Sequence, residues 1–204
     1  MFRFVSDPNQ LAAQLLSGEC DLGTQDAAYD EALPMFHSLA AEGLLALQTA
    51  PGLVFEHIDF NAQPLSTYRG FAGIARNETG TFVFDQPEVR QAVAHCLDRP
   101  ALLDQVARDA AVLWNTYLPP SHPLYAGDEN LPVVAFDPLL GKELLARHGW
   151  RDTDADGWLD KDGRRFSLVL SIRRSTLRDQ IAPLIADQLQ AHCGIEVQVQ
   201  PYGA

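Results

Sequence analysis

Apolar residues recur with helical spacing in five segments of the chain, at residues 7–18, 85–98, 98–106, 137–149 and 175–194. In the second segment the i, i+3, i+4, i+7 and i+8 positions are Val89, Ala92, Val93, Cys96 and Leu97. This spacing places an apolar stripe on one face of a helix, which packs against a core. We therefore expect five amphipathic helices.

The residues at the ends of these segments favour helix termini. Pro8 and Pro138 follow an aspartate at the first helical position, where proline is preferred. Glycine follows the last turn of three segments, at Gly18, Gly149 and Gly194. Asp85 and Glu88 have the spacing of a capping box, so we expect Asp85 to cap its helix. Pro183 lies inside the last segment and predicts a kink there.

Shorter segments have the composition and alternation of strands. Residues 166–172 and 195–199 alternate apolar and polar side chains, residues 53–60 are rich in strand-forming types, and residues 44–48 are a weaker candidate. Strands interleaved with helices indicate an α/β fold with a mixed sheet flanked by helices. The first five residues, Met1 to Val5, also resemble a strand that begins abruptly.

Two stretches between these elements are expected to be surface loops. Residues 63–80 contain three glycines and few periodic apolar positions. Residues 118–132 contain four prolines, so they are expected to run as an extended strap over the surface. The 204 residues are otherwise expected to form a single domain, because a chain of this length buries enough surface for one core.

Charge excludes some classes of partner. The formal net charge is −12, whereas nucleic-acid binding depends on clustered Lys and Arg, so no nucleic-acid partner is expected. Anionic membrane surfaces are disfavoured for the same reason. No apolar run reaches the ~18 residues that a membrane span requires.

Motifs for catalysis and for zinc are absent from the sequence. The chain contains no GxSxG, GxxxxGK[ST], GxGxxG or HExxH pattern, and its six histidines are dispersed, so no enzymatic activity is expected. Cys20, Cys96 and Cys193 form no CxxC pair and do not indicate a disulfide framework. Their odd number leaves at least one free thiol, and the two that lie on helical faces are expected to pack as small apolar residues.

The strongest candidate site is the acidic loop, residues 152–163, with five aspartates. Asp152, Asp154 and Asp156 occupy positions 1, 3 and 5 of a calcium loop, Gly157 position 6 and Asp160 position 9, and Trp158 at position 7 would offer its carbonyl oxygen. These hard oxygen ligands suit Ca²⁺, which would be structural because no catalytic group accompanies it.

The loop also departs from this pattern. Position 12, which supplies a bidentate glutamate in an EF-hand, is Gly163. The alternative is an acidic surface hairpin in which aspartate and glycine only form the turn. No cofactor is required on either interpretation.

Six segments, in the same order along the chain, resemble the extracellular solute-binding proteins of the peptide/nickel class, which serve ABC importers. They are Leu15–Asp21, Phe60–Asn61, Asp85–Arg99, Leu118–Pro123, Phe136–Trp150 and Gly194–Val197. The acidic loop is similar to an aspartate-rich insertion of some members, with Ala155 in place of a glycine. The resemblance implies one lobe, the second, of a type II periplasmic-binding-protein fold.

This resemblance implies function and partners. The chain would form one wall of a cleft that closes on a small solute or peptide, against the first lobe of the same protein, and the whole would dock to the membrane permease of an ABC importer. It would be periplasmic or extracellular, held at the membrane through the importer. Thr24, Gln25 and Asn61 are candidate ligand contacts, and the alternative for each is an ordinary cap or turn residue. A calcium-stabilised extracellular interaction module is the alternative function.

Overall fold

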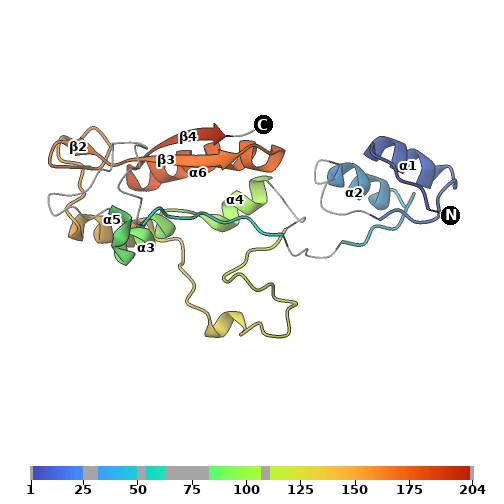
Figure 1. The fold of residues 1–204 in the computed structure, drawn as a ribbon, viewed down its shortest axis with the longest axis horizontal. Helices are drawn as coiled ribbons and strands as arrows, with labels where there is room; N and C mark the ends of the chain where they lie inside the picture. Colours follow the sequence, from blue (N-terminus) through green and yellow to red (C-terminus); the bar gives the residue numbers. More distant parts are fainter. Residues whose placement is uncertain (1, 25–31, 50–53, 63–82, 107–110, 203–204) are drawn as a thin grey trace.

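The computed structural model describes residues 2–24, 32–49, 54–62, 83–106 and 111–202 (Figure 1). The helices in these ranges are α1 (Pro8–Leu16), α2 (Leu33–Ala41), α3 (Pro87–His95), α4 (Arg99–Val106), α5 (Pro138–Arg147) and α6 (Thr176–Cys193), with single 3₁₀ turns η2 (Val83–Asp85) and η4 (Asp128–Asn130). The strands are β1 (Asp160–Lys161), β2 (Arg164–Arg165), β3 (Ser167–Arg173) and β4 (Glu196–Tyr202). All five expected helices are confirmed.

Side-chain caps fix the start of several helices. The Asp137 carboxylate accepts a hydrogen bond from the Leu140 amide at 3.0 Å, and the Ser175 hydroxyl accepts one from the Arg178 amide at 3.2 Å. Gly194 ends α6 with φ of +66°, a conformation that glycine adopts without steric cost.

The capping box expected at Asp85 is wrong. Asp85 belongs to the 3₁₀ turn η2, and Gln86 precedes α3 without a capping side-chain hydrogen bond. Pro87 is the first helical residue of α3, so the helix begins one residue later than the capping-box spacing requires. Pro183 lies within α6, which continues through it over 18 residues.

The expected strands at 166–172 and 195–199 are confirmed as β3 and β4. They pair in parallel, from Ser167 opposite Glu196 to Arg173 opposite Tyr202, and α6 connects them. Figure 1 shows α6 lying along this pair. The short strands β1 and β2 pair antiparallel in a separate hairpin. The α/β class is therefore confirmed, and among the described residues its parallel and antiparallel pairs form two sheets.

Three other strand expectations are wrong for the residues that the structure describes. Residues 44–48 and the described part of the segment 53–60 form no strand, and neither do residues 2–5. Val54 is 79% exposed, so its side chain does not contribute to a sheet face. Strand propensity reflects packing against neighbouring strands, and no strand within the described ranges pairs with these segments.

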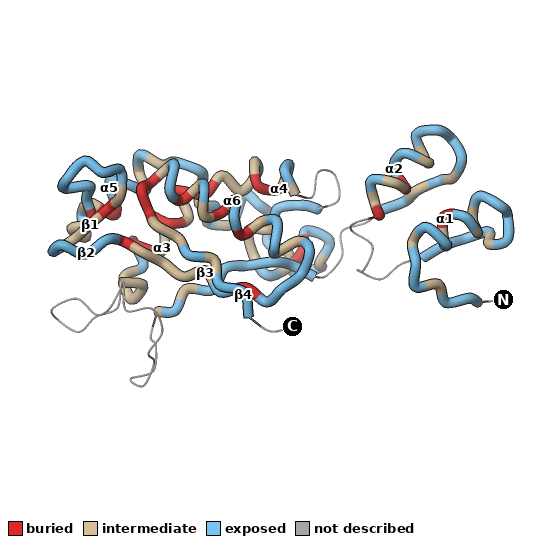
Figure 2. Tube along the Cα trace, turned by 90° about the horizontal axis from the view of Figure 1, so that it is seen from above, coloured by how far each residue is buried: buried red, intermediate tan, exposed pale blue. Residues whose placement is uncertain are grey.

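The described residues hold two hydrophobic clusters (Figure 2). The larger one joins α3, α4, α5, α6 and the parallel strands, and its fully buried side chains include Val89, Leu145, Phe166 and Ile195. The smaller one contains Ala12, Ala32 and Phe36, from α1 and the region of α2. Figure 1 shows α1 and α2 together near the N terminus, apart from the other helices. The single-domain expectation stays a prediction.

A disulfide joins Cys96, which ends α3, to Cys193, the last residue of α6. Their Cα atoms are 6.0 Å apart and the residues are 97 positions apart in the sequence. The sequence did not indicate this bond, which forms because the fold brings the ends of the two helices together. Both side chains are buried, as expected for their helical faces. Cys20 is a free, half-buried thiol.

The proline-rich strap, residues 118–132, contains η4 and is otherwise irregular. Next to the strap, the Arg99 guanidinium donates to the side-chain oxygen of Asn115 at 2.7 Å, and the Asn115 amide donates to Asp128 at 3.0 Å. The Tyr125 hydroxyl donates to the same Asp128 oxygen at 2.5 Å. These bonds lower the pKa of Asp128, and the bond to Asp128 raises the pKa of Tyr125 to about 12. The network ties the strap to the start of α4.

Candidate functional site

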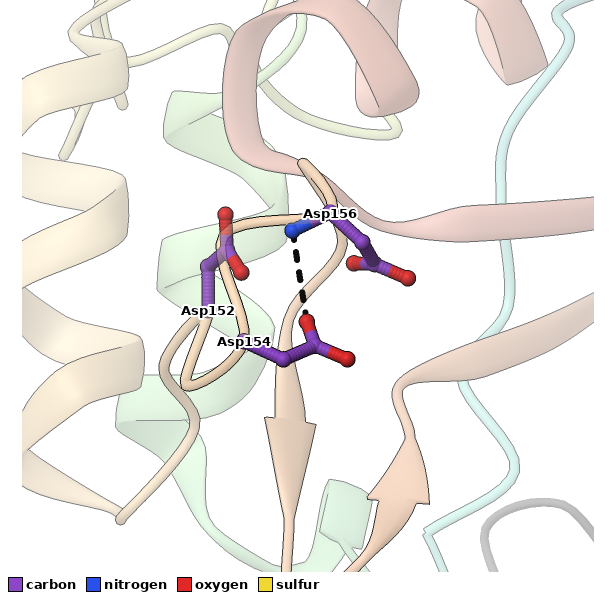
Figure 3. A group of neighbouring side chains, drawn as sticks. All are labelled: Asp152, Asp154 and Asp156. Atoms are coloured by element: carbon purple, nitrogen blue, oxygen red, sulfur yellow. Dashed lines mark hydrogen bonds between the residues drawn. The ribbon is translucent and has the colours of Figure 1, made fainter.

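Three aspartates converge in the acidic loop (Figure 3). Asp152, Asp154 and Asp156 each offer a carboxylate oxygen, and these three oxygens lie within 4.8 Å of one another. The loop begins after Trp150, which packs on Phe166 with ring centroids 4.6 Å apart, and it ends in the hairpin of β1 and β2. Buried aromatic packing therefore supports one end of an exposed loop.

Backbone amides hold these carboxylates in place. Asp152 accepts from the Gly157 amide at 3.0 Å, Asp154 from the Asp156 amide at 3.2 Å, and Asp156 from the Trp158 amide at 2.9 Å. Gly157 has φ of +90°, as expected for the residue that turns the chain back. The loop thus presents three anionic groups from one tight turn.

Asp160 does not join this cluster. Its two oxygens accept hydrogen bonds from the Thr153 amide at 2.9 Å and the Thr153 hydroxyl at 2.7 Å. These hydrogen bonds lower the pKa of Asp160. The structure therefore brings together three of the four carboxylates that the sequence predicts as metal ligands.

Arg165 is a charged neighbour of the loop that sequence reasoning missed. Its guanidinium pairs with Asp156 at 2.5 Å and lies over the Trp158 ring, 5.1 Å from the ring centroid. The pairing follows from the fold, since the hairpin turns β2 back toward the loop. A cation of the protein itself therefore offsets part of the negative charge.

The two candidate ligand contacts that the structure describes lie in irregular segments. Thr24 and Asn61 are exposed, and Gln25 lies outside the described residues. Asn61 follows Phe60, whose ring packs against Phe84 with centroids 4.9 Å apart. The core thus anchors the segment that presents Asn61.

An ion pair ties the same extended segment to α6. The Arg178 guanidinium donates to both oxygens of Glu56, at 2.8 and 2.9 Å, and this pairing raises the pKa of Arg178. Nearby, the Phe55 ring lies 5.3 Å from that of Trp114, measured between centroids. Glu56 and Arg178 are 122 residues apart, so no local pattern in the sequence indicates their pairing.

An open pocket of about 340 Å³ lies beside the acidic loop. Trp150 and Leu159 supply apolar surface, and Lys142, Arg151 and Asp152 supply charged groups. It borders the end of α6 at Cys193 and Gly194.

Solved structures define the class of fold. The chain is similar to the Bacillus subtilis oligopeptide-binding protein AppA in complex with a nonapeptide, with a TM-score of 0.54 and 34% identity over 58% of this chain and 24% of that chain. It is also similar to NikA from Brucella suis in complex with Fe(III)-EDTA, with a TM-score of 0.53 and 25% identity over 63% and 25% of the two chains. The fold is that of part of a type II periplasmic binding protein.

Sequence comparison identifies the family. The model of the bacterial extracellular solute-binding proteins, family 5, middle region, matches residues 1–204. The chain belongs to this family, which confirms the resemblance seen in its sequence. Members of the family are periplasmic or extracellular substrate-binding proteins of ABC importers. None of the helices in the described ranges combines the length and apolarity needed to cross a membrane.

Curated relatives agree with this assignment. The chain is 30% identical to the oligopeptide-binding protein AppA of Bacillus subtilis over 203 residues, which is 98% of this chain and 32% of AppA. It is 27% identical to a dipeptide-binding protein of Pseudomonas aeruginosa over 149 residues, which is 73% of this chain and 24% of that protein. The chain therefore spans about a third or less of the length of these relatives.

Proposed function

We propose that the protein containing this chain binds a peptide for import by an ABC transporter, and that the chain forms one wall of the ligand cleft. The family match over residues 1–204 carries this proposal. Peptide is the proposed solute because both curated relatives described above, and one of the two similar solved structures, are named for binding peptides. Hinge closure between lobes, with the solute stabilising the closed state, would make binding a signal to the importer. The alternative of an interaction module is not favoured, because the family model covers the chain from end to end.

The partners follow from this proposal. The first lobe of the same protein would supply the opposite wall, and permease subunits in the membrane would receive the loaded protein. A periplasmic or extracellular location is further supported by the disulfide between Cys96 and Cys193, because such bonds persist mainly in oxidising compartments.

For ligand contacts we propose Thr24, Gln25 and Asn61. The exposure of Thr24 and Asn61 leaves their polar groups free to meet a solute. Calorimetry on the full-length protein with a peptide, a sugar and a nickel chelate tests both ideas. We expect heat from the peptide only, weaker binding by Asn61→Ala, and unchanged binding by Asn9→Ala, an exposed asparagine in α1. Binding of the sugar or chelate alone would overturn the peptide assignment, and equal affinities of the two variants would overturn the role of Asn61.

For the acidic loop we propose a structural Ca²⁺. Asp152, Asp154 and Asp156 would hold it, with the Trp158 carbonyl and Asp160, directly or through water, completing the oxygen ligands. Calcium would relieve the repulsion among the three carboxylates.

Thermal melts with Ca²⁺ and with chelator test this proposal. At ~2 mM Ca²⁺ and a Kd of ~10⁻⁴ to 10⁻³ M, the stabilisation is roughly 0.7 to 1.8 kcal/mol, or a few degrees in Tm. Asp154→Ala should abolish the shift, and Asp104→Ala, an exposed aspartate in α4, should keep it. An unmoved wild-type midpoint would leave the loop as an acidic turn only.

A further inference from the structure

The disulfide lies beneath the first half of α5. Cys96 and Cys193 are both 0% exposed. A Cβ atom built on Gly141 of α5 would lie 2.7 Å from the sulfur of Cys96 and 3.3 Å from that of Cys193. Only a residue without a side chain lets the helix approach this closely, so the backbone of α5 itself covers the sulfurs.

The start of α5 is fastened to the elements that carry the cysteines. The Asp137 amide donates to the His95 carbonyl at 2.9 Å, next to Cys96. The ring of His192 lies 2.9 Å, measured from its Nδ1, from the Cys96 carbonyl oxygen, and Phe136 packs on that ring at 4.7 Å between centroids. The nearby open pocket borders Cys193 without exposing it.

This burial conflicts with the chemistry that makes and breaks disulfides. Thiol–disulfide exchange requires a thiolate to attack a sulfur and form a mixed disulfide, so its rate depends on access to that sulfur. In the folded chain an exchange protein cannot reach either sulfur unless α5 moves away.

We propose that the Cys96–Cys193 bond closes before α5 docks, and that α5 then seals it against thiol reagents. The bond would be introduced by thiol–disulfide exchange with a dithiol–disulfide oxidoreductase, whose own disulfide is the donor disulfide. The two cysteines lose two protons and two electrons as their S–S bond forms. The donor disulfide breaks and takes up both, becoming a dithiol. Because exchange is reversible, reduction of the folded protein requires the same displacement of α5.

Reduction by dithiothreitol tests the seal in the full-length protein. The native protein and the same protein in concentrated guanidinium are sampled over time, alkylated, and analysed by mass spectrometry of the peptides that contain Cys96 and Cys193. We expect reduction of the native protein to be at least about 100-fold slower, which corresponds to an opening free energy of about 2.8 kcal/mol or more. Cys20 should be alkylated rapidly under native conditions and serves as the internal reference.

Two leucines of α5 test whether this helix is the cover. Leu145 is fully buried, whereas Leu139 is 81% exposed on the same helix. Leu145→Ala should accelerate reduction of the native protein at least about tenfold, because it loosens the packing of α5, and Leu139→Ala should leave the rate unchanged.

A second, less disruptive variant tests the same point if Leu145→Ala does not fold. Asp137→Ala removes the cap of α5 and should accelerate reduction about two- to thirtyfold. Phe36→Ala, which weakens the smaller cluster instead, should not accelerate it. Reduction of the native protein within a few-fold of the unfolded rate, or equal acceleration by Phe36→Ala and Asp137→Ala, would overturn the proposal. None of these outcomes depends on which solute the protein binds.

Discussion

Replacing both bonded cysteines by alanine should destabilise the larger cluster substantially. In the chain-entropy model, a disulfide that spans 97 residues lowers the entropy of the unfolded chain. Its removal then costs about 4.7 kcal/mol at 25 °C. For a folding unit of about 150–250 residues, this loss of stability corresponds to a decrease of about 9–19 °C in Tm. The free energy of unfolding should therefore fall mainly because the unfolded state of the Cys96→Ala/Cys193→Ala variant is less constrained.

Equilibrium guanidinium unfolding, followed by tryptophan fluorescence, measures this difference. Trp150 lies in the larger cluster against Phe166, so its emission reports on the packing there. Cys20→Ala is the matched control, since it removes a sulfur without breaking a bond. A double variant within about 1 kcal/mol of the wild type, well below the 2–5 kcal/mol usual for a native disulfide, would refute this reasoning. So would an equal loss from Cys20→Ala.

Two further predictions concern single positions. Gly141→Ala should destabilise the chain by about 1–3 kcal/mol in the same unfolding assay, because the added methyl group has no space. The control Lys142→Ala, at the neighbouring exposed position, should change the free energy of unfolding by no more than about 0.5 kcal/mol. Equal stabilities of the two variants would contradict the close approach of α5. Asp128→Asn should return the pKa of Tyr125 from about 12 towards 10.0, read as tyrosinate absorbance at 295 nm with Tyr125→Phe as the subtraction. The bond to Asp128 stabilises the fold below the unfolded tyrosine pKa, and its contribution is lost as the pH rises through the folded value. An unchanged titration in Asp128→Asn would contradict this assignment.

Five of the six described helices were predictable because their signals are local, whereas α2, which has no side-chain cap, was missed. The cap at Asp137 and the terminating glycine at Gly194 each act within one turn of their own helix. The strand expected at residues 53–60 failed because strand-forming residues specify a strand only beside a partner. The disulfide could not be predicted, since only the packed fold brings residues 97 positions apart within bonding distance.

In the candidate metal site too, the contacts between residues close in sequence were predictable, and the contacts made only by the fold were not. The spacing of Asp152, Asp154 and Asp156 within one turn is enough to bring their oxygens together. Asp160 lies further along, in β1, where Thr153 engages both of its oxygens. Arg165 reaches Asp156 only because the hairpin reverses the chain. The spacing of the acidic residues therefore could not predict a contact that depends on the reversal of the backbone.

The bond between Cys96 and Cys193 also makes a covalent ring of everything that lies between them, including the proline-rich strap. Exposed, irregular segments are where proteases cut, and Leu124 in the strap is 75% exposed. A cut there opens the ring but does not divide the molecule, since both new ends remain attached through the sulfurs. A nicked chain would therefore migrate as one species on a gel without reductant and as two fragments once the sulfurs are reduced.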